Sequence, residues 1–388
     1  MNAASDPGLC LAMIVRNEVA VLDRALDSVL PFVDTWRIID TGSDDGTPEL
    51  VRARLGHLDG QLRHSTWIDF GTNRSELVAW ATEAADWLLL LDADMTVDAD
   101  ADLRRQLDAF DADAAMVAVE GGIAYRMPYL VRGGLPWSFT GRTHEYLSCG
   151  VPFSTGWFDG LRVRHHGDGG TRDEKLDRDV RLLHRDLLDD PANSRTHFYL
   201  AQTLRDAGDL ATAIEHYQRR VELGGWEEEV FFAQYQVGLL EDRLGREACT
   251  ESLLRAWDLR PTRAEPMYHL ARINRLRGHH HLAWIFSTLA ASIPKPDDLL
   301  FVESWIYDWA ASFEQVDAGW RIGHDDLVRQ GAAALLARDD LPDDHRDHLL
   351  VIVDDLAGRG EDPDDGRACS PRPEGSTGRP EVERADAS

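Results

Sequence analysis

Two aspartates that follow an apolar run are the residues of this sequence best suited to chemistry. Asp92 and Asp94 flank Ala93 and come directly after Trp87–Leu91, a run typical of a buried strand. Carboxylates spaced i, i+2 at a strand end are the hard oxygen ligands that Mg²⁺ or Mn²⁺ prefers, and the bound ion can bridge a substrate diphosphate. The alternative is that both aspartates only cap the following turn. Neighbouring segments must decide between these two interpretations.

Strands and helices alternate through the first half of the chain, and this pattern predicts a mostly parallel, doubly wound α/β sheet of Rossmann-like type. The expected strands are Leu9–Val15, Trp36–Ile39, Leu62–Ile68 and Trp87–Leu91, and the expected helices are Val19–Val33, Pro48–Leu55 and Gly71–Ala84. Ligands of such sheets bind beyond the carboxyl ends of the strands. The polar clusters at those ends are Arg16–Glu18, Asp40–Thr47, Asp69 and Asp92–Asp94.

Three of these segments, taken in order, resemble the family-2 glycosyltransferases. They are Leu11–Glu18 (LAMIVRNE), Asp40–Thr47 (DTGSDDGT) and Trp87–Asp94 (WLLLLDAD), and the resemblance covers residues 9–170. It implies a GT-A fold, a DxD motif, a nucleotide-sugar donor (UDP-linked by expectation), bound Mn²⁺ or Mg²⁺, and inversion at the anomeric carbon.

The resemblance also implies which residues contact the donor. Asp40 is expected near the nucleobase and ribose, and Val15 and Asn17 are expected to line the base pocket. The stretch Asp69–Ser75 (DFGTNRS) resembles one whose arginine faces the nucleotide, which here is Arg74. The predicted donor-binding residues are Val15, Asn17, Asp40, Asp69, Arg74, Asp92 and Lys175.

Glu145, in the segment Gly141–Glu145, is the candidate general base. An inverting transferase needs a group that takes the proton from the attacking acceptor, within hydrogen-bond reach of it. The GT-A layout places an acidic residue here, with His144 as its neighbour or orienting group. The alternative is a glutamate that caps the start of a helix.

Two adjacent histidines follow an alternating strand that starts at Leu161. GT-A enzymes commonly supply a histidine from this region as a further metal ligand, and imidazole suits a Mn²⁺ site. Spacing to Gly167 favours His165, but the alternation leaves His166 open as well. The predicted metal ligands are therefore Asp92, Asp94, His165 and His166.

The segment Thr171–Asp179 carries Arg172, Lys175 and Arg178. Cations on a mobile loop could close over the departing diphosphate and stabilise its charge. A solvated first turn of a helix, with ion pairs between neighbouring turns, explains the same pattern.

The second half of the chain has a helical pattern with an internal repeat. Gly208, Gly245 and Gly278 each follow an apolar helical stretch, at a spacing close to the tetratricopeptide (TPR) period of about 34 residues. The expected domains are 1–175 (GT-A), 176–295 (TPR-like repeats), 296–357 (helical extension or cap) and 358–388 (disordered tail).

Composition excludes some classes of partner. The chain has 69 acidic and 41 basic residues, a formal net charge of −28, so nucleic acid is an unsuitable partner. An anionic donor then needs local positive charge, which a divalent ion supplies. Four scattered cysteines, the absence of a signal-like start and the absence of a long apolar run predict a cytoplasmic protein without a membrane span.

The acceptor is predicted from the domain order. A family-2 domain followed by TPR-like helices is similar to the peptide S-glycosyltransferases of the sublancin type, which implies a peptide or protein acceptor. A glycan, lipid-linked or small-molecule acceptor is the alternative within the same chemistry. A nucleotidyltransferase would need a basic, glycine-rich loop where Arg16–Glu18 stands. A non-catalytic TPR scaffold is the alternative of another class. The sugar and the oligomeric state stay open.

Overall fold

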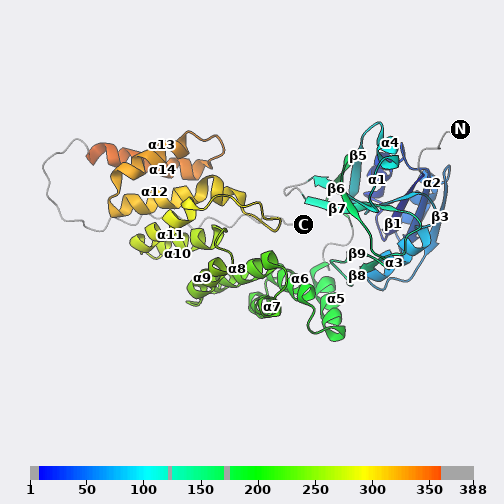
Figure 1. Cartoon of the computed structure of the whole chain (residues 1–388), viewed down its shortest axis with the longest axis horizontal. Helices are drawn as coiled ribbons and strands as arrows, with labels where there is room; N and C mark the ends of the chain where they lie inside the picture. The colour runs from blue at the N-terminus through cyan, green and yellow to red at the C-terminus, as the bar shows by residue number, and fades with distance from the viewer. Residues whose placement is uncertain (1–7, 121–124, 170–174, 360–388) are drawn as a thin grey trace. The chain divides into compact units, whose positions relative to one another are not determined.

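The computed structural model describes residues 8–120, 125–169 and 175–359 (Figure 1). Two compact units divide the described chain: the first ends at Pro191 and the second begins at Ala192. The expected boundary after residue 175 lies earlier, at the start of a helix that packs with the first unit. Residues from 360 onward, which include most of the expected tail, lie outside the described part.

A mixed sheet forms the centre of the first unit. Its strands are β1 (Leu9–Val15), β2 (Thr35–Asp40), β3 (Asp59–His64), β4 (Trp87–Leu90), β5 (Met95–Ala99), β6 (Ala114–Glu120), β7 (Tyr125–Arg132) and β10 (Thr155–His165). Within the described residues these eight strands have the order β3-β2-β1-β4-β7-β6-β10-β5. Strands β3, β2, β1 and β4 run parallel, as do β6 and β10, whereas β7 and β5 are antiparallel to their neighbours. The predicted mostly parallel α/β sheet is confirmed.

Helices cover both faces of this sheet. They are α1 (Leu22–Val29), α2 (Thr47–Leu55), α3 (Phe70–Ala81) and α4 (Leu103–Asp108), and α5 (Lys175–Asp189) follows β10. Alternate residues of β1 point to opposite faces. Leu11 and Met13 pack in one core with α1, α2 and α4. Cys10 and Ala12 pack in the other with α3. A separate hairpin, β8 (Trp137–Thr140) and β9 (Tyr146–Cys149), lies on the α3 side.

The second unit consists of helices. They are α6 (Ser194–Asp206), α7 (Leu210–Leu223), α8 (Glu227–Arg243), α9 (Cys249–Leu259), α10 (Glu265–Leu276), α11 (His280–Ser292), the π-helix η1 (Ile306–Ala310), α12 (Ala311–Ile322), α13 (Asp325–Leu336) and α14 (Asp343–Arg359). Gly208, Gly245 and Gly278 adopt positive φ angles of 89°, 69° and 76° just after α6, α8 and α10, where each helix must turn back on its partner. The predicted TPR-like repeats are therefore present as helix pairs α6–α7, α8–α9 and α10–α11.

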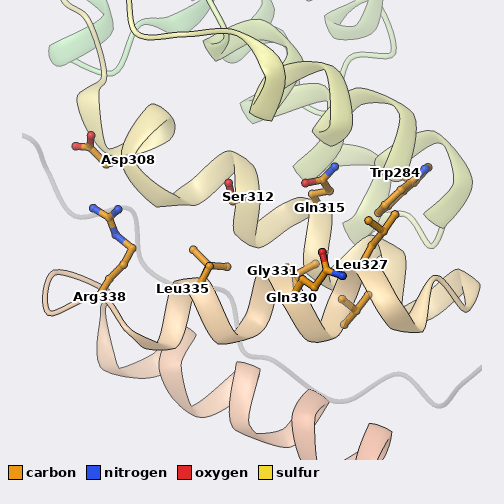
Figure 2. Close-up of a pocket in the computed structure, with 12 residues that line it drawn as sticks. Trp284, Asp308, Ser312, Gln315, Leu327, Gln330, Gly331, Leu335 and Arg338 are labelled. Atoms are coloured by element: carbon orange, nitrogen blue, oxygen red, sulfur yellow. The ribbon is translucent and has the colours of Figure 1, made fainter.

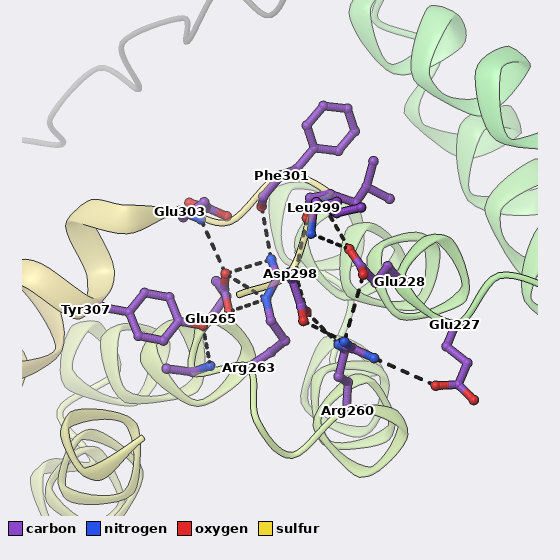
Figure 3. A network of polar contacts seen from close by, with 12 residues as sticks. Glu227, Glu228, Arg260, Arg263, Glu265, Asp298, Leu299, Phe301, Glu303 and Tyr307 are labelled. Atoms are coloured by element: carbon purple, nitrogen blue, oxygen red, sulfur yellow. Dashed lines mark hydrogen bonds and ion pairs between the residues drawn. The ribbon is translucent and has the colours of Figure 1, made fainter. Parts of the chain in front are cut away.

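A buried charge network fixes the segment after α11 to these repeats (Figure 3). The side chains of Arg263 and Glu265 are both fully buried and lie 2.7 Å apart. Arg263 also donates to the carbonyl oxygens of Leu300 (3.1 Å) and Phe301 (3.0 Å). Because one guanidinium satisfies both a buried carboxylate and two backbone carbonyls, its loss would leave several buried polar groups unpaired.

A cavity of about 430 Å³ lies between α12 and α13 (Figure 2). Trp284 and Leu327 border one end, and Asp308 and Arg338 border the other. It lies in the second unit, and none of the predicted donor, metal or base residues line it.

Candidate functional site

The carboxyl ends of β1 and β2 lie side by side, and Asp40 organises the loop between β2 and α2 (residues 41–46). Val15 pairs with Asp40 across the two strands, and the Asp40 side chain is only 2% exposed. Its carboxylate accepts the backbone N–H groups of Gly42 (3.2 Å) and Ser43 (3.3 Å). It also lies 3.0 Å from Nδ1 of His64, at the end of β3. These contacts of Asp40 therefore fix the conformation of the loop.

Asn17 ties the end of β1 to the same loop. Its side-chain oxygen accepts the backbone N–H of Asp44 (2.9 Å), and its own N–H donates to the hydroxyl of Ser43 (2.9 Å). Asn17 has a φ of 56°, a left-handed conformation that asparagine tolerates better than most residues. Val15, by contrast, turns its side chain into the sheet core, so only its backbone can face the loop.

Asp92 and Asp94 occupy a tight turn between β4 and β5, where the N–H of Met95 donates to the carbonyl of Asp92 (3.1 Å). Arg74 of α3 donates through Nη2 to Asp92 (2.6 Å), and its Nε lies 2.7 Å from Oε1 of Glu145. One guanidinium thus joins the first aspartate of the turn to the predicted base. Sequence reasoning placed Arg74 towards the nucleotide and did not foresee this bridge.

A glycine allows Glu145 to approach α3. A Cβ at Gly71 would lie 2.0 Å from the carbonyl oxygen of Gly141, so a larger residue would push this loop away. Glu145 itself lies in the β8–β9 turn and begins no helix, which removes the helix-capping alternative. Its side chain is 12% exposed.

Burial and neighbouring charges shift the pKa values of Glu145 and Arg74 in this group. Burial raises the pKa of Glu145, and the charge of Arg74 offsets this only in part. Burial lowers the pKa of Arg74, but Asp92 and Glu145 outweigh burial and raise it above its ordinary value. Arg74 therefore stays charged while Glu145 has an increased affinity for a proton, a property suited to a general base.

The structure distinguishes the two adjacent histidines. His165 places Nε2 at 3.2 Å from Oδ2 of Asp94, whereas Nε2 of His166 lies 2.9 Å from the hydroxyl of Thr96. Burial raises the pKa of Asp94, but the hydrogen bond and the charge of His165 outweigh it and hold the carboxyl below its ordinary pKa. Contact with Asp94 raises the pKa of His165 in turn. The side chain of His165 therefore belongs to the group around Asp94, whereas His166 reaches Asp94 through its backbone N–H, which donates to the Asp94 carbonyl (3.0 Å).

Asp94 and His165 provide a carboxylate and an imidazole that face each other, and these donor types suit Mn²⁺. Among the described residues no group of three or more His, Cys, Asp or Glu side chains is arranged to hold an ion. Asp92 is engaged by Arg74. An ion held by Asp94 and His165 alone would take most of its ligands from water or from a bound anion.

Part of the first unit is similar to a known family. Residues 10–168 match the model described as glycosyl transferase family 2. A TPR repeat-containing protein of Synechococcus elongatus is 32% identical over 256 residues, which cover 61% of this chain and 62% of that relative. The chain therefore spans less than two thirds of its relative's length.

Two solved structures show a weaker likeness. The complex of S. aureus TarS (residues 1–349) with UDP-GlcNAc is 12% identical, with a TM-score of 0.36, and covers 62% of this chain and 92% of that chain. MamA is 20% identical, with a TM-score of 0.33, and covers 48% of this chain and 93% of that chain. Such scores are too low to transfer a ligand or a residue role.

Three other predicted residues lie at the margin of this candidate site. Asp69 is buried and caps α3 by accepting the N–H of Thr72 (2.6 Å) through one oxygen, while its other oxygen lies 3.8 Å from Nε of Arg142. His144 is exposed and has a φ of 50°, a left-handed backbone conformation within the β8–β9 turn. Lys175 begins α5. It is exposed and exerts a small lowering effect on the pKa of His165, against the larger effect of Asp94. Arg172 lies outside the described residues.

Two contributors to the site were missed by sequence reasoning. His64 supports Asp40, and its place at the end of the third strand was the available signal. Asp186 of α5 contacts Arg142, three residues before Glu145. No sequence pattern indicates a contact across 44 residues.

Among the described residues, no helix combines the length and the apolar composition that a membrane span requires.

Proposed function

We propose that the first unit transfers a sugar, with inversion, from a UDP-linked or other nucleotide-diphosphate sugar to a peptide or protein acceptor. The observation that supports this best is the chain of contacts Asp92–Arg74–Glu145, with Asp94 and His165 beside it. In this chain of contacts the Arg74 guanidinium links Glu145, whose pKa is raised, to the turn proposed to hold the diphosphate.

The nucleoside is proposed to bind over the β2–α2 loop. Asp40 and Asn17 hold that loop, and β2, β1 and β4 lie side by side in the sheet with their carboxyl ends at one edge. A nucleoside on the loop therefore directs its diphosphate towards Asp92 and Asp94. Lys175 is proposed as a cation near the diphosphate.

The transfer is a single displacement. A lone pair of the acceptor oxygen, sulfur or nitrogen forms a bond to the anomeric carbon, and the bond from that carbon to the diphosphate oxygen breaks. The acceptor proton passes to Glu145, and the electron pair of the broken bond leaves on the diphosphate. Burial of Glu145 raises its proton affinity, which improves proton abstraction in the transition state. Arg74 orients the carboxylate for that transfer.

A divalent ion is proposed at Asp94 and His165. When bound there with the donor, it would supply positive charge to the departing diphosphate. Asp92, held by Arg74, would fix the turn that positions Asp94.

Metal binding should depend on nucleotide. With only two protein ligands, the free protein should bind Mn²⁺ weakly, and saturating UDP should tighten binding by at least about tenfold, because phosphate oxygens complete the coordination sphere. Calorimetric titration with and without UDP measures this. Replacing His165 with alanine should weaken the UDP-dependent binding, while the matched His166→Ala variant should bind like the wild type. Equal affinity with and without UDP would contradict the proposed site.

The acceptor is proposed from the TPR-like unit, since stacked helical repeats form extended surfaces suited to peptides. One radiolabelled donor, offered with peptides, glycans, lipid-linked acceptors and small molecules, tests this choice. We expect label in the peptide or protein fraction. Transfer to a glycan or lipid alone would retain the chemistry and reject the acceptor class. The absence of any donor turnover would reject the enzyme and favour a TPR scaffold.

A further inference from the structure

The turn that carries Glu145 is held from two sides. On one side is α3, where the N–H of Phe70 donates to the carbonyl of Arg142 (3.0 Å) and Arg74 contacts Glu145. The turn contains two left-handed residues, Gly141 (φ 96°) and His144 (φ 50°). A non-glycine residue in that conformation is costly, so the surrounding contacts must maintain this backbone.

The other side is α5, whose inner face carries acidic residues. Asp179 and Asp186 are seven residues apart, two helical turns, and so lie on the same face as the buried Leu182 and Leu183. Asp179 is 4% exposed, and the Asp186 side chain is 14% exposed. Buried carboxylates on a helix need partners, and both find them in the turn.

Asp186 makes the strongest of these contacts. It accepts the backbone N–H of Arg142 (3.1 Å) through one oxygen and Nη1 of the Arg142 guanidinium (2.6 Å) through the other. The hydroxyl of Thr143 faces Asp179 at 3.5 Å. Asp186 therefore contacts both the backbone and the side chain of Arg142, and the Nη2 of that side chain also donates to Asp189 of α5 (2.7 Å).

The helix α5 lies beyond the part of the chain that matches the family. The family match ends at residue 168, and α5 begins at Lys175. The turn with the proposed base is thus stabilised by a helix that follows the matched segment in the chain. The same helix ends two residues before the last residue of the first unit.

We infer that α5 is a positioning element of the transferase and that Asp186 is a positioning residue which acts through Glu145. This inference rests on the proposed function. A displacement of about 1 Å at a reacting group can cost about 100-fold in rate. Loss of Asp186 therefore affects the chemical step, whereas donor binding at the β2–α2 loop is preserved.

A double-mutant cycle tests the inference on the full chain, with UDP release from the UDP-sugar that the wild type hydrolyses fastest as the readout. Asp186→Ala should lower kcat about 10- to 100-fold and leave the donor KM within about twofold. In a Glu145→Gln background the same change should alter the residual rate less than about twofold, because the group that it positions is already absent. The matched control is Asp177→Ala, at an exposed aspartate of α5, which should behave like the wild type.

Each outcome of the cycle either supports or overturns the inference that Asp186 acts through Glu145. An Asp186→Ala variant as active as the wild type, or one that loses the same factor in both backgrounds, overturns the inference and leaves the proposed function intact. A wild type that releases UDP from no donor overturns both. If Asp186→Ala does not fold, Asp186→Asn keeps the side-chain volume and is judged by the same two criteria.

Discussion

Replacing Glu145 with glutamine should lower kcat by about 10²- to 10⁴-fold, the usual contribution of a positioned general base. Glutamine keeps the shape of the side chain and can still contact Arg74, but it cannot take the acceptor proton. Since Glu145 touches Arg74 and not the β2–α2 loop, the donor KM should stay nearly constant. Steady-state UDP release at saturating donor measures both constants.

The matched control for this variant lies on α3. Glu76 is exposed and accepts the hydroxyl of Ser65, so Glu76→Gln removes a carboxylate of the same helix that holds Arg74 without touching the proposed base. It should retain wild-type kcat. A Glu145→Gln variant within about threefold of the wild type would show that another group takes the proton.

Replacing Arg263 with alanine should destabilise the helical unit by about 3–5 kcal/mol, the range observed when one partner of a buried ion pair is removed. Glu265 would remain fully buried with only Tyr307 (2.6 Å) and the N–H of Glu303 (3.3 Å) as donors. The carbonyl groups of Leu300 and Phe301 would also lose their partner. Urea unfolding followed by circular dichroism at 222 nm reports this helical unit.

An exposed ion pair of the same unit provides the comparison. Arg255 and Glu251 lie one turn apart on α9, and their side chains are 68% and 69% exposed. Arg255→Ala should change the unfolding free energy by about 0.5 kcal/mol or less. Equal effects of the two arginine variants would contradict a stabilising role for the buried network shown in Figure 3.

The centre of the sheet could be predicted because β1 and β4 are short and wholly apolar, and both are buried at every position. Runs of this length and composition favour a buried strand. The third strand was misplaced: β3 covers Asp59–His64, whereas Leu62–Ile68 was predicted, because β3 is mostly polar and none of its residues is buried. Antiparallel β7 and β5 were not foreseen, since no local pattern specifies the direction of a neighbouring strand.

The candidate site was predictable where residues follow strand ends and was not where they meet through packing. Asp40 ends β2, and Asp92 and Asp94 follow β4, so all three lie at the same edge of the sheet. The choice between His165 and His166 needed the pairing of His165 with Met95 across β10 and β5. The Arg74 bridge spans 18 residues to Asp92 and depends on the close approach that Gly71 allows. Val15 was expected to line the base pocket, but its side chain is buried in the sheet core.

The most direct test of the account is Mn²⁺-dependent hydrolysis of a panel of nucleotide sugars by the wild type and by Asp94→Ala. The account predicts that the wild type releases nucleoside diphosphate from at least one donor only when Mn²⁺ or Mg²⁺ is present. Asp94→Ala should reduce that rate about 100-fold or more, because it removes the carboxylate that faces His165. No turnover of any donor by the wild type, or equal rates for the two proteins, would contradict it.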